Sequence, residues 1–242
     1  MALLLRDLDK RVAEAVACFW KTRASQAEKQ LSAGRKDQGA RSAVTGGSQM
    51  DGFALLIAEL VTSAGIPQTE IYRKRAIELP GYFRPTKEWD LLVVSKNRLL
   101  GAIEAKSQVG PSFGNNFNNR TEEAMGSAVD LWTAYREGAF RESSRPWLGY
   151  LFILEDCAAS RQPVSVREPH FEVFPEFRDA SYARRYELFC RKLVLERHYT
   201  AAAFLMSDKS HGLHGEYAEP AHDLNFERFA RSLVAHLGAW AS

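Results

Sequence analysis

Two carboxylates and one lysine stand at a spacing that could hold a divalent cation and hydrolyse a phosphodiester. Asp90 opens the apolar run Leu91–Val94, and Glu104 and Lys106 stand near the end of a second apolar run. Residues two apart on a strand share a face, so Glu104 and Lys106 point the same way. Mg²⁺ is usually held by one or two carboxylates together with waters and phosphate oxygens, and a lysine beside it can orient the attacking water.

The same residues also fit a second interpretation, an ordinary solvated strand face with one salt bridge. The two strands are otherwise strongly apolar, which favours the catalytic interpretation. If the strands pair as a hairpin, Asp90 lies beside the end of the strand that carries Glu104 and Lys106. Two carboxylates and one ammonium group then converge at one edge of the sheet.

The segment 110–121 is rich in asparagine and follows the Glu-x-Lys strand directly. We predict a loop here, with a helix beginning near Asn119. Asparagine and arginine form bidentate hydrogen bonds with adenine and guanine edges, so the segment could contact DNA bases. A polar loop that caps the following helix is an equally weighted alternative. The candidate DNA-binding residues are Asn115, Asn116, Asn118, Asn119 and Arg120.

The elements that must position these residues follow from the apolar periodicity. The pattern predicts helices over about 3–31, 50–64, 119–137, 182–199 and 225–240, and strands over 70–79, 89–95, 99–106, 147–154 and 201–206. This order indicates an antiparallel meander, a helical crossover and further buried strands, in an α/β (α+β) fold with a mixed sheet between helices. We predict one domain over 1–242, with an N-terminal helical part of about 1–66 and a core of about 67–242.

Composition excludes several classes of protein and leaves the partner open. The 242 residues are 45% hydrophobic and 26% charged, which excludes collagen-like, disordered and disulfide-scaffold chains. The net charge of +2 hides basic segments offset by an acidic stretch at 207–227. One basic segment is a glycine-containing stretch, 32–49, which we interpret as a mobile loop that carries Arg35, Lys36 and Arg41.

The cysteines and the apolar runs indicate a soluble intracellular protein. Three widely spaced cysteines with no C-x-x-C pair suit buried thiols in a reducing cytoplasm. The first residues lack the apolar stretch of a signal peptide, and the longest apolar run, 53–58, is too short to cross a bilayer. We therefore expect no membrane contact.

At the residues quoted above, the sequence resembles the XhoI-type type II restriction endonucleases of the PD-(D/E)xK superfamily. The resemblance is carried by Arg35–Ser42, by the strand Glu88–Val94 and by the segment Ile103–Arg120, and it extends in layout over nearly the whole chain. It implies a restriction-endonuclease-like core with a mixed central sheet flanked by helices. It also implies a Mg²⁺-dependent homodimer that cuts double-stranded DNA at the palindrome CTCGAG, leaving 5′ overhangs, in a bacterial cytoplasm that also contains a cognate methyltransferase.

The resemblance also implies roles for individual residues. Asp90 and Glu104 would bind the metal and Lys106 would serve the attacking water, while Trp89 replaces the proline that usually precedes the first acid. Some of these nucleases add an acid from the preceding helix, and Glu59 is the candidate here. Glu59 stands in an otherwise apolar segment, where a carboxylate needs a partner, although a glutamate on the polar side of the helix is an equally good account.

The basic 32–49 loop and the 110–121 segment would hold the DNA, the second nearer the bases. Two other functions remain open: a repair or recombination nuclease that recognises DNA structure on the same core, and a catalytically degenerate DNA-binding module. The intact Asp90, Glu104 and Lys106 speak against the second alternative.

Overall fold

The computed structural model describes residues 5–32 and 48–241. Its helices are α1 (Leu8–Ser32), α3 (Asp51–Ser63), α4 (Phe113–Arg136), α5 (Ala158–Arg161), α6 (Tyr182–Leu195), α7 (Lys209–Gly212) and α8 (Phe226–Ala241). Its strands are β1 (Ile71–Tyr72), β2 (Glu78–Pro80), β3 (Thr86–Glu88), β4 (Leu91–Ser95), β5 (Arg98–Gln108), β6 (Trp147–Glu155) and β7 (Ala201–Ser207).

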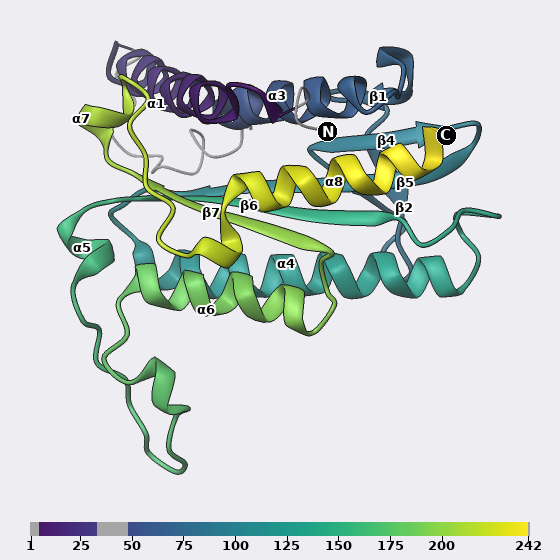
Figure 1. Ribbon diagram of the computed structural model, residues 1–242. Helices are drawn as coiled ribbons and strands as arrows, with labels where there is room; N and C mark the ends of the chain where they lie inside the picture. Colours follow the sequence, from purple (N-terminus) through teal and green to yellow (C-terminus); the bar gives the residue numbers. More distant parts are fainter. Residues whose placement is uncertain (1–4, 33–47, 242) are drawn as a thin grey trace.

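A five-stranded sheet with the order β1-β4-β5-β6-β7 forms the middle layer. The first three strands pair antiparallel, whereas β5, β6 and β7 pair parallel. Helices α4 and α6 cover one face, and α1, α3 and α8 cover the other (Figure 1). The predicted α/β class, with a mixed sheet between helices, is confirmed.

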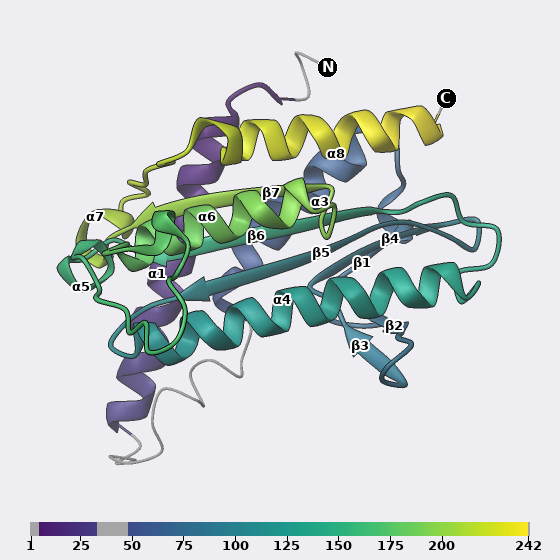
Figure 2. The same cartoon turned by 90° about the horizontal axis from the view of Figure 1, so that it is seen from below.

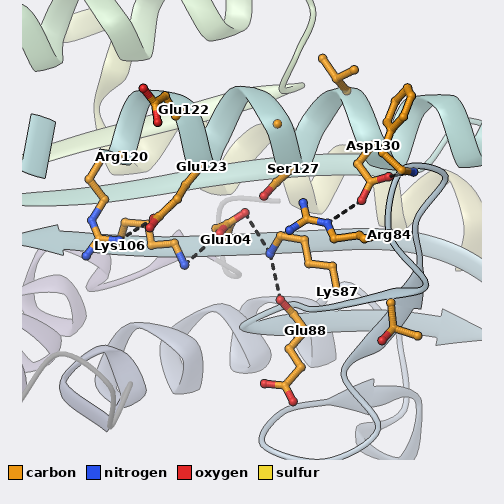
Figure 3. A pocket seen from close by; sticks show the side chains of 14 residues that line it. Arg84, Lys87, Glu88, Glu104, Lys106, Arg120, Glu122, Glu123, Ser127 and Asp130 are labelled. Atoms are coloured by element: carbon orange, nitrogen blue, oxygen red, sulfur yellow. Dashed lines mark hydrogen bonds and ion pairs between the residues drawn. The ribbon is translucent and has the colours of Figure 1, made fainter. Parts of the chain in front are cut away.

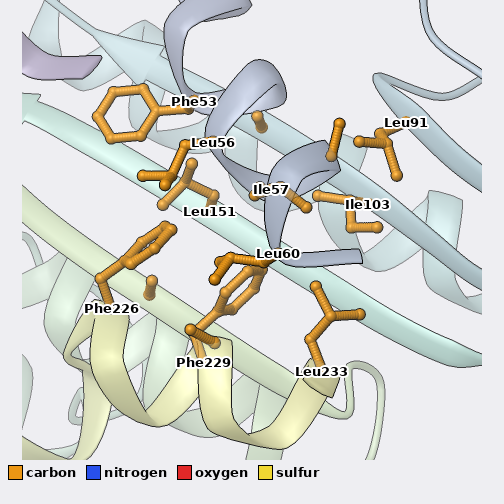
Figure 4. Close-up of a cluster of buried hydrophobic side chains, with 14 of the residues drawn as sticks. Phe53, Leu56, Ile57, Leu60, Leu91, Ile103, Leu151, Phe226, Phe229 and Leu233 are labelled. Atoms are coloured by element: carbon orange, nitrogen blue, oxygen red, sulfur yellow. The ribbon is translucent and has the colours of Figure 1, made fainter. Parts of the chain in front are cut away.

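Both faces of the sheet are buried, which explains its nearly continuous apolar strands. On β5, Ile103 and Ala105 belong to the core cluster shared with α1, α3 and α8, in which Phe53 of α3 and Phe229 of α8 also lie (Figure 4). Ala102 belongs to the cluster on the α4 and α6 side. The alternation along β5 therefore directs Glu104 and Lys106 toward α4.

The predicted β4–β5 hairpin is confirmed. Leu91 pairs with Ile103, and the backbone N–H of Asp90 donates to the carbonyl of Ile103 at 3.1 Å. Lys96 and Asn97 form the turn with φ of 49° and 61°. Positive φ at both central residues matches the twist of a tight hairpin.

The prediction of one strand over 70–79 is wrong. Two short strands, β1 and β2, lie in different sheets, and the chain between them turns at Lys74 and Ala76, both of which have positive φ. β2 pairs with β3 in a separate two-stranded hairpin that lies beside α4 (Figure 2).

The prediction of a loop over 110–121 is also wrong, because α4 begins at Phe113. Phe113 is buried, and Phe117, one turn further on, contacts the rings of Tyr182 and Tyr186 of α6. Packing of this aromatic face outweighs the weak helix propensity of the intervening asparagines. The expected mobile loop of 32–49 falls almost entirely on 33–47, outside the described residues, together with Arg35, Lys36 and Arg41.

Candidate active site

Glu104 is a buried carboxylate whose two oxygens are each paired with a lysine. Its side chain is only 2% exposed; Lys106 Nζ lies 2.9 Å from Oε1 and Lys87 Nζ lies 3.2 Å from Oε2 (Figure 3). The hydroxyl of Tyr199 lies 3.5 Å from Oε2 and donates to the carbonyl of Ala124 at 3.1 Å. A buried carboxylate needs such partners, and here two ammonium groups balance its charge.

Asp90, the residue immediately before β4, also belongs to this cluster. Its Oδ2 accepts a hydrogen bond of 2.8 Å from the backbone N–H of Ala105, which lies between Glu104 and Lys106 on β5. The sheet register thus brings Asp90, Glu104 and Lys106 together, as the sequence predicted.

The charges of the cluster shift the pKa of each member. Burial acts to raise the pKa of Glu104, but Lys106 and Lys87 together outweigh it and hold that pKa below its ordinary value. Burial raises the pKa of Asp90, although the ammonium group of Lys106 opposes the shift. Burial acts to lower the pKa of Lys106, but Glu104 and Asp90 hold it above its ordinary value. Glu104 is therefore ionised and Lys106 is protonated at neutral pH.

Lys87 is the residue of this cluster that the sequence analysis missed. It lies on β3, its side chain is 12% exposed, and its Nζ stands 4.1 Å from the ring centre of Trp89. Burial lowers its pKa despite the nearby charge of Glu104. The one available signal was the excess of basic residues over 71–87, which did not single out this lysine.

A hollow of about 790 Å³ opens beside the cluster, between the β2–β3 hairpin, β5 and α4. Glu104 and Lys106 line it from β5 and Lys87 lines it from β3 (Figure 3). Arg120 lines it from α4, where it pairs with Glu123 at 2.5 Å. The hollow is large enough to admit a phosphate group with its waters, and Glu104, Lys87 and Lys106 of the cluster stand at its wall.

Of the other predicted residues that the structure describes, only Arg120 lines the hollow. The four asparagines lie on the first turns of α4; Asn115, Asn118 and Asn119 are exposed and Asn116 is partly buried. None of the four lines the hollow, whereas Arg120 does. Glu59 is not brought into the cluster: it lies on α3, is 64% exposed, and pairs with Arg11 at 2.7 Å.

The carboxylate oxygens of the cluster suit a Mg²⁺ ion whose other ligands are water and substrate oxygens. No group of three or more His, Cys, Asp or Glu side chains gathers as a metal site within the described part of the chain. Within the cluster Asp90 and Glu104 supply the carboxylate oxygens, and Mg²⁺ commonly takes one or two carboxylates and keeps waters and phosphate oxygens as its other ligands. The two residues therefore fit this ion.

A mixed sheet that carries an acid at the start of one strand and Glu-x-Lys on the next defines the class of restriction-endonuclease-like nucleases. A comparison with protein families agrees: the family model of restriction endonuclease XhoI matches residues 29–219. The chain belongs to the XhoI restriction endonuclease family. No solved structure matches it significantly.

Three type II restriction enzymes share high sequence identity with the chain. Type II restriction enzyme BstVI of Geobacillus stearothermophilus is 58% identical over 212 residues, 86% of this chain and 95% of the relative. Type II restriction enzyme XhoI of Xanthomonas vasicola is 48% identical over 198 residues, 81% of this chain and 79% of the relative. Type II restriction enzyme AbrI of Azospirillum brasilense is 52% identical over 172 residues, 71% and 77% of the two chains.

These relatives make the chain a type II restriction enzyme, which is a site-specific deoxyribonuclease. Its substrate is therefore DNA. Among the helices of the described residues, none has the length and apolar character needed to cross a membrane.

Proposed function

We propose that this enzyme makes Mg²⁺-dependent double-strand cuts at the palindrome CTCGAG and leaves 5′ overhangs. The observation that carries the proposal is the convergence of Asp90, Glu104 and Lys106 in a chain of the XhoI family, with Glu104 and Lys106 lining an open hollow. The sequence and the cofactor come from the family resemblance, and the paired carboxylates supply the chemistry that Mg²⁺ requires.

In this proposal Asp90 and Glu104 hold Mg²⁺, and Lys106 orients the attacking water. Mg²⁺ held there would supply Lewis-acid chemistry, stabilising charge on the scissile phosphate and favouring ionisation of the attacking water. The ammonium group of Lys106 is fixed by Glu104 at 2.9 Å, so it can donate to the water and to a phosphate oxygen on which negative charge develops. Glu59 takes no part, because it is paired with Arg11 and exposed.

DNA would be held by Arg120 at the hollow and by further basic and amide side chains of the chain. Arg120 lines the hollow from α4, and the exposed Asn115, Asn118 and Asn119 lie on the turns of the same helix. Asn116, with Arg35, Lys36 and Arg41 of the N-terminal basic segment, completes the proposed set. The amides suit base edges and the guanidinium and ammonium groups suit phosphates.

We propose a homodimer, because a palindromic site has the two-fold symmetry of two identical subunits. Each subunit would cut one strand. The enzyme would work in a bacterial cytoplasm, where a cognate methyltransferase protects the host's own sites.

The test is cleavage of a plasmid that carries one CTCGAG site, with Mg²⁺ and with excess chelator, followed by sequencing of the ends. The proposal predicts one linear product with 5′ overhangs at CTCGAG and no cutting in chelator. Cutting at another sequence would overturn the assigned site, and cutting only at branched or nicked DNA would support a structure-specific nuclease instead. Sedimentation of the active enzyme as a monomer on DNA would overturn the dimer.

A further inference from the structure

Two aromatic side chains stand exposed at the mouth of the catalytic hollow. Tyr82 is 56% exposed and Phe83 is 70% exposed, and both lie in the turn that joins β2 to β3. Their rings contact each other edge to face, with centres 5.3 Å apart. Phe83 lines the hollow together with Glu104 and Lys106. Large apolar groups left in water at a charged site call for an occupant that covers them.

The turn is held in place by one carboxylate of α4. Oδ1 of Asp130 accepts hydrogen bonds from the backbone N–H of Tyr82 at 2.6 Å and of Phe83 at 2.8 Å. Its Oδ2 accepts from Nε of Arg84 at 2.6 Å, and the Asp130 side chain is 4% exposed. Three charge-assisted bonds to a buried anchor fix the backbone that carries the aromatic pair.

Gly81 makes this close approach possible. A Cβ at position 81 would overlap the carboxylate of Asp130, so no side chain fits there without displacing the anchor. The turn therefore combines a rigid backbone with rings that are free to meet something outside the chain. A fixed backbone with exposed rings is suited to inserting those rings into a binding partner.

The family of the chain makes DNA the partner to consider for this pair. Arg84, Lys87, Lys106 and Arg120 line the same hollow beside five carboxylates, and these cations can contact phosphates of DNA seated there. A nucleic-acid backbone seated in the hollow would place its sugars and bases against the turn. Apolar wedges that enter between base steps unstack and kink a duplex.

We propose that Tyr82 and Phe83 insert into the bound duplex beside the cleaved bond and unstack a base step, and that Asp130 is the positioning residue of this wedge. The proposal rests on the proposed function, since it takes duplex DNA as the substrate of the hollow. It assigns to the β2–β3 turn a role in deforming the site. Binding then depends on how readily the sequence at that step unstacks.

The test uses the full-length Lys106→Ala protein with Mg²⁺ and a series of CTCGAG duplexes, each with 2-aminopurine at one position in or beside the site. Fluorescence of 2-aminopurine rises when the base is unstacked. The proposal predicts a rise at one step, which disappears when Tyr82→Ala and Phe83→Ala are added. Loss of the stacked contacts weakens binding by about tenfold or more. Both side chains are exposed, so these variants are expected to fold.

Two positioning variants and one control complete the design. Asp130→Asn and Gly81→Ala should reduce the fluorescence rise while leaving both rings present, a result that loss of apolar surface alone would not give. The double variant Phe171→Ala/Phe174→Ala removes another exposed aromatic pair and should leave the rise unchanged.

Each contrary outcome has a distinct meaning. A rise that persists without Tyr82 and Phe83, or an equal loss in the Phe171/Phe174 control, overturns the wedge. Conversion of a dimer to a monomer by Tyr82→Ala/Phe83→Ala also overturns it, because it assigns the pair to contact between copies. Absence of any duplex binding by the Lys106→Ala protein overturns the proposed function as well.

Discussion

The backbone N–H of Ala105 donates a 2.8 Å hydrogen bond to Oδ2 of Asp90 and so ties the start of β4 to the part of β5 that carries Glu104 and Lys106. The bond fixes the side chain of Asp90 beside the strand that carries Glu104 and Lys106. It also leaves the second carboxylate oxygen of Asp90 available to a cation, since no other side-chain hydrogen bond to Asp90 is found among the described residues. The pairing of two strands thereby prepares a two-carboxylate site.

Asp90→Asn should abolish most of the cleavage without unfolding the protein. The amide oxygen can still accept from Ala105, but the negative charge that attracts Mg²⁺ is gone. We expect the rate of plasmid cleavage at fixed Mg²⁺ to fall by about 100-fold or more. The matched control is Asp51→Asn, which removes an acid paired with Lys74 away from the hollow and should cut at the normal rate. Equal rates for both variants would contradict the role of Asp90.

Lys87→Met should lower stability in the absence of divalent cations. Removing this ammonium group leaves Oε2 of the buried Glu104 with only the distant Tyr199 hydroxyl as a partner. We expect the free energy of unfolding, measured with urea, to fall by about 1–3 kcal/mol. Lys74→Met breaks a pair whose lysine is 67% exposed and should cost at most about 1 kcal/mol. A smaller effect at Lys87 than at Lys74 would show that the buried pair does not stabilise the fold.

The ion pair between Asp130 and Arg84 should make stability depend on pH. Burial acts to raise the pKa of Asp130, but the hydrogen bonds from Arg84, Phe83 and Tyr82 outweigh it and hold that pKa below its ordinary value. A carboxyl with a depressed pKa stabilises the fold above its unfolded pKa and loses that effect as the pH falls through its folded pKa.

Asp130→Asn should therefore be less stable than the parent at neutral pH, by about 1–2 kcal/mol. The difference should shrink in acid, because the parent's carboxyl then becomes neutral as well. Urea unfolding of both proteins at neutral and at acidic pH measures it. A difference that stays constant over this range would contradict the pKa shift.

The first turns of α4 offer a test of helix against loop. Asn115 is exposed, and alanine has the higher helix propensity, so Asn115→Ala should stabilise the protein by about 0.5 kcal/mol. Phe113→Ala removes a buried ring and should cost about 3 kcal/mol or more. If the segment were a loop, Asn115→Ala would have no stabilising effect. The same variant should weaken binding to CTCGAG duplex if Asn115 contacts a base edge.

The sequence predicted the parts of the site that depend on local pattern. Alternation along the two apolar runs placed Glu104 and Lys106 on one face, and the short turn between the runs placed Asp90 beside them. Lys87 could not be found in this way, because its place depends on a separate β2–β3 hairpin that has only three residues in each strand. The contact between Glu104 and Tyr199 joins residues even further apart in the sequence. It depends on how the segment after α6 packs against the sheet, which local pattern does not predict.

The predicted start of α4 was wrong for a different reason. Asparagines are typical of loops and helix caps, so the four asparagines favoured a loop. The helical spacing of Phe113 and Phe117 was therefore given no weight. Those two rings pack against α6, a helix about 70 residues further along the chain, so their effect becomes visible only when the layers are assembled. Glu59 shows the reverse case, where a surface pair with Arg11 satisfies a carboxylate that the sequence left without a partner.

The most direct measurement compares DNA cleavage and DNA binding by Lys106→Ala with those of Lys74→Ala, on one CTCGAG duplex with Mg²⁺. We expect Lys106→Ala to bind the duplex with nearly normal affinity, because Arg84, Lys87 and Arg120 remain at the hollow, but to cut it about 100-fold or more slowly, because the group that orients the water is lost. Lys74→Ala should bind and cut normally. Full cutting by Lys106→Ala would contradict the central claim that Asp90, Glu104 and Lys106 form the catalytic site.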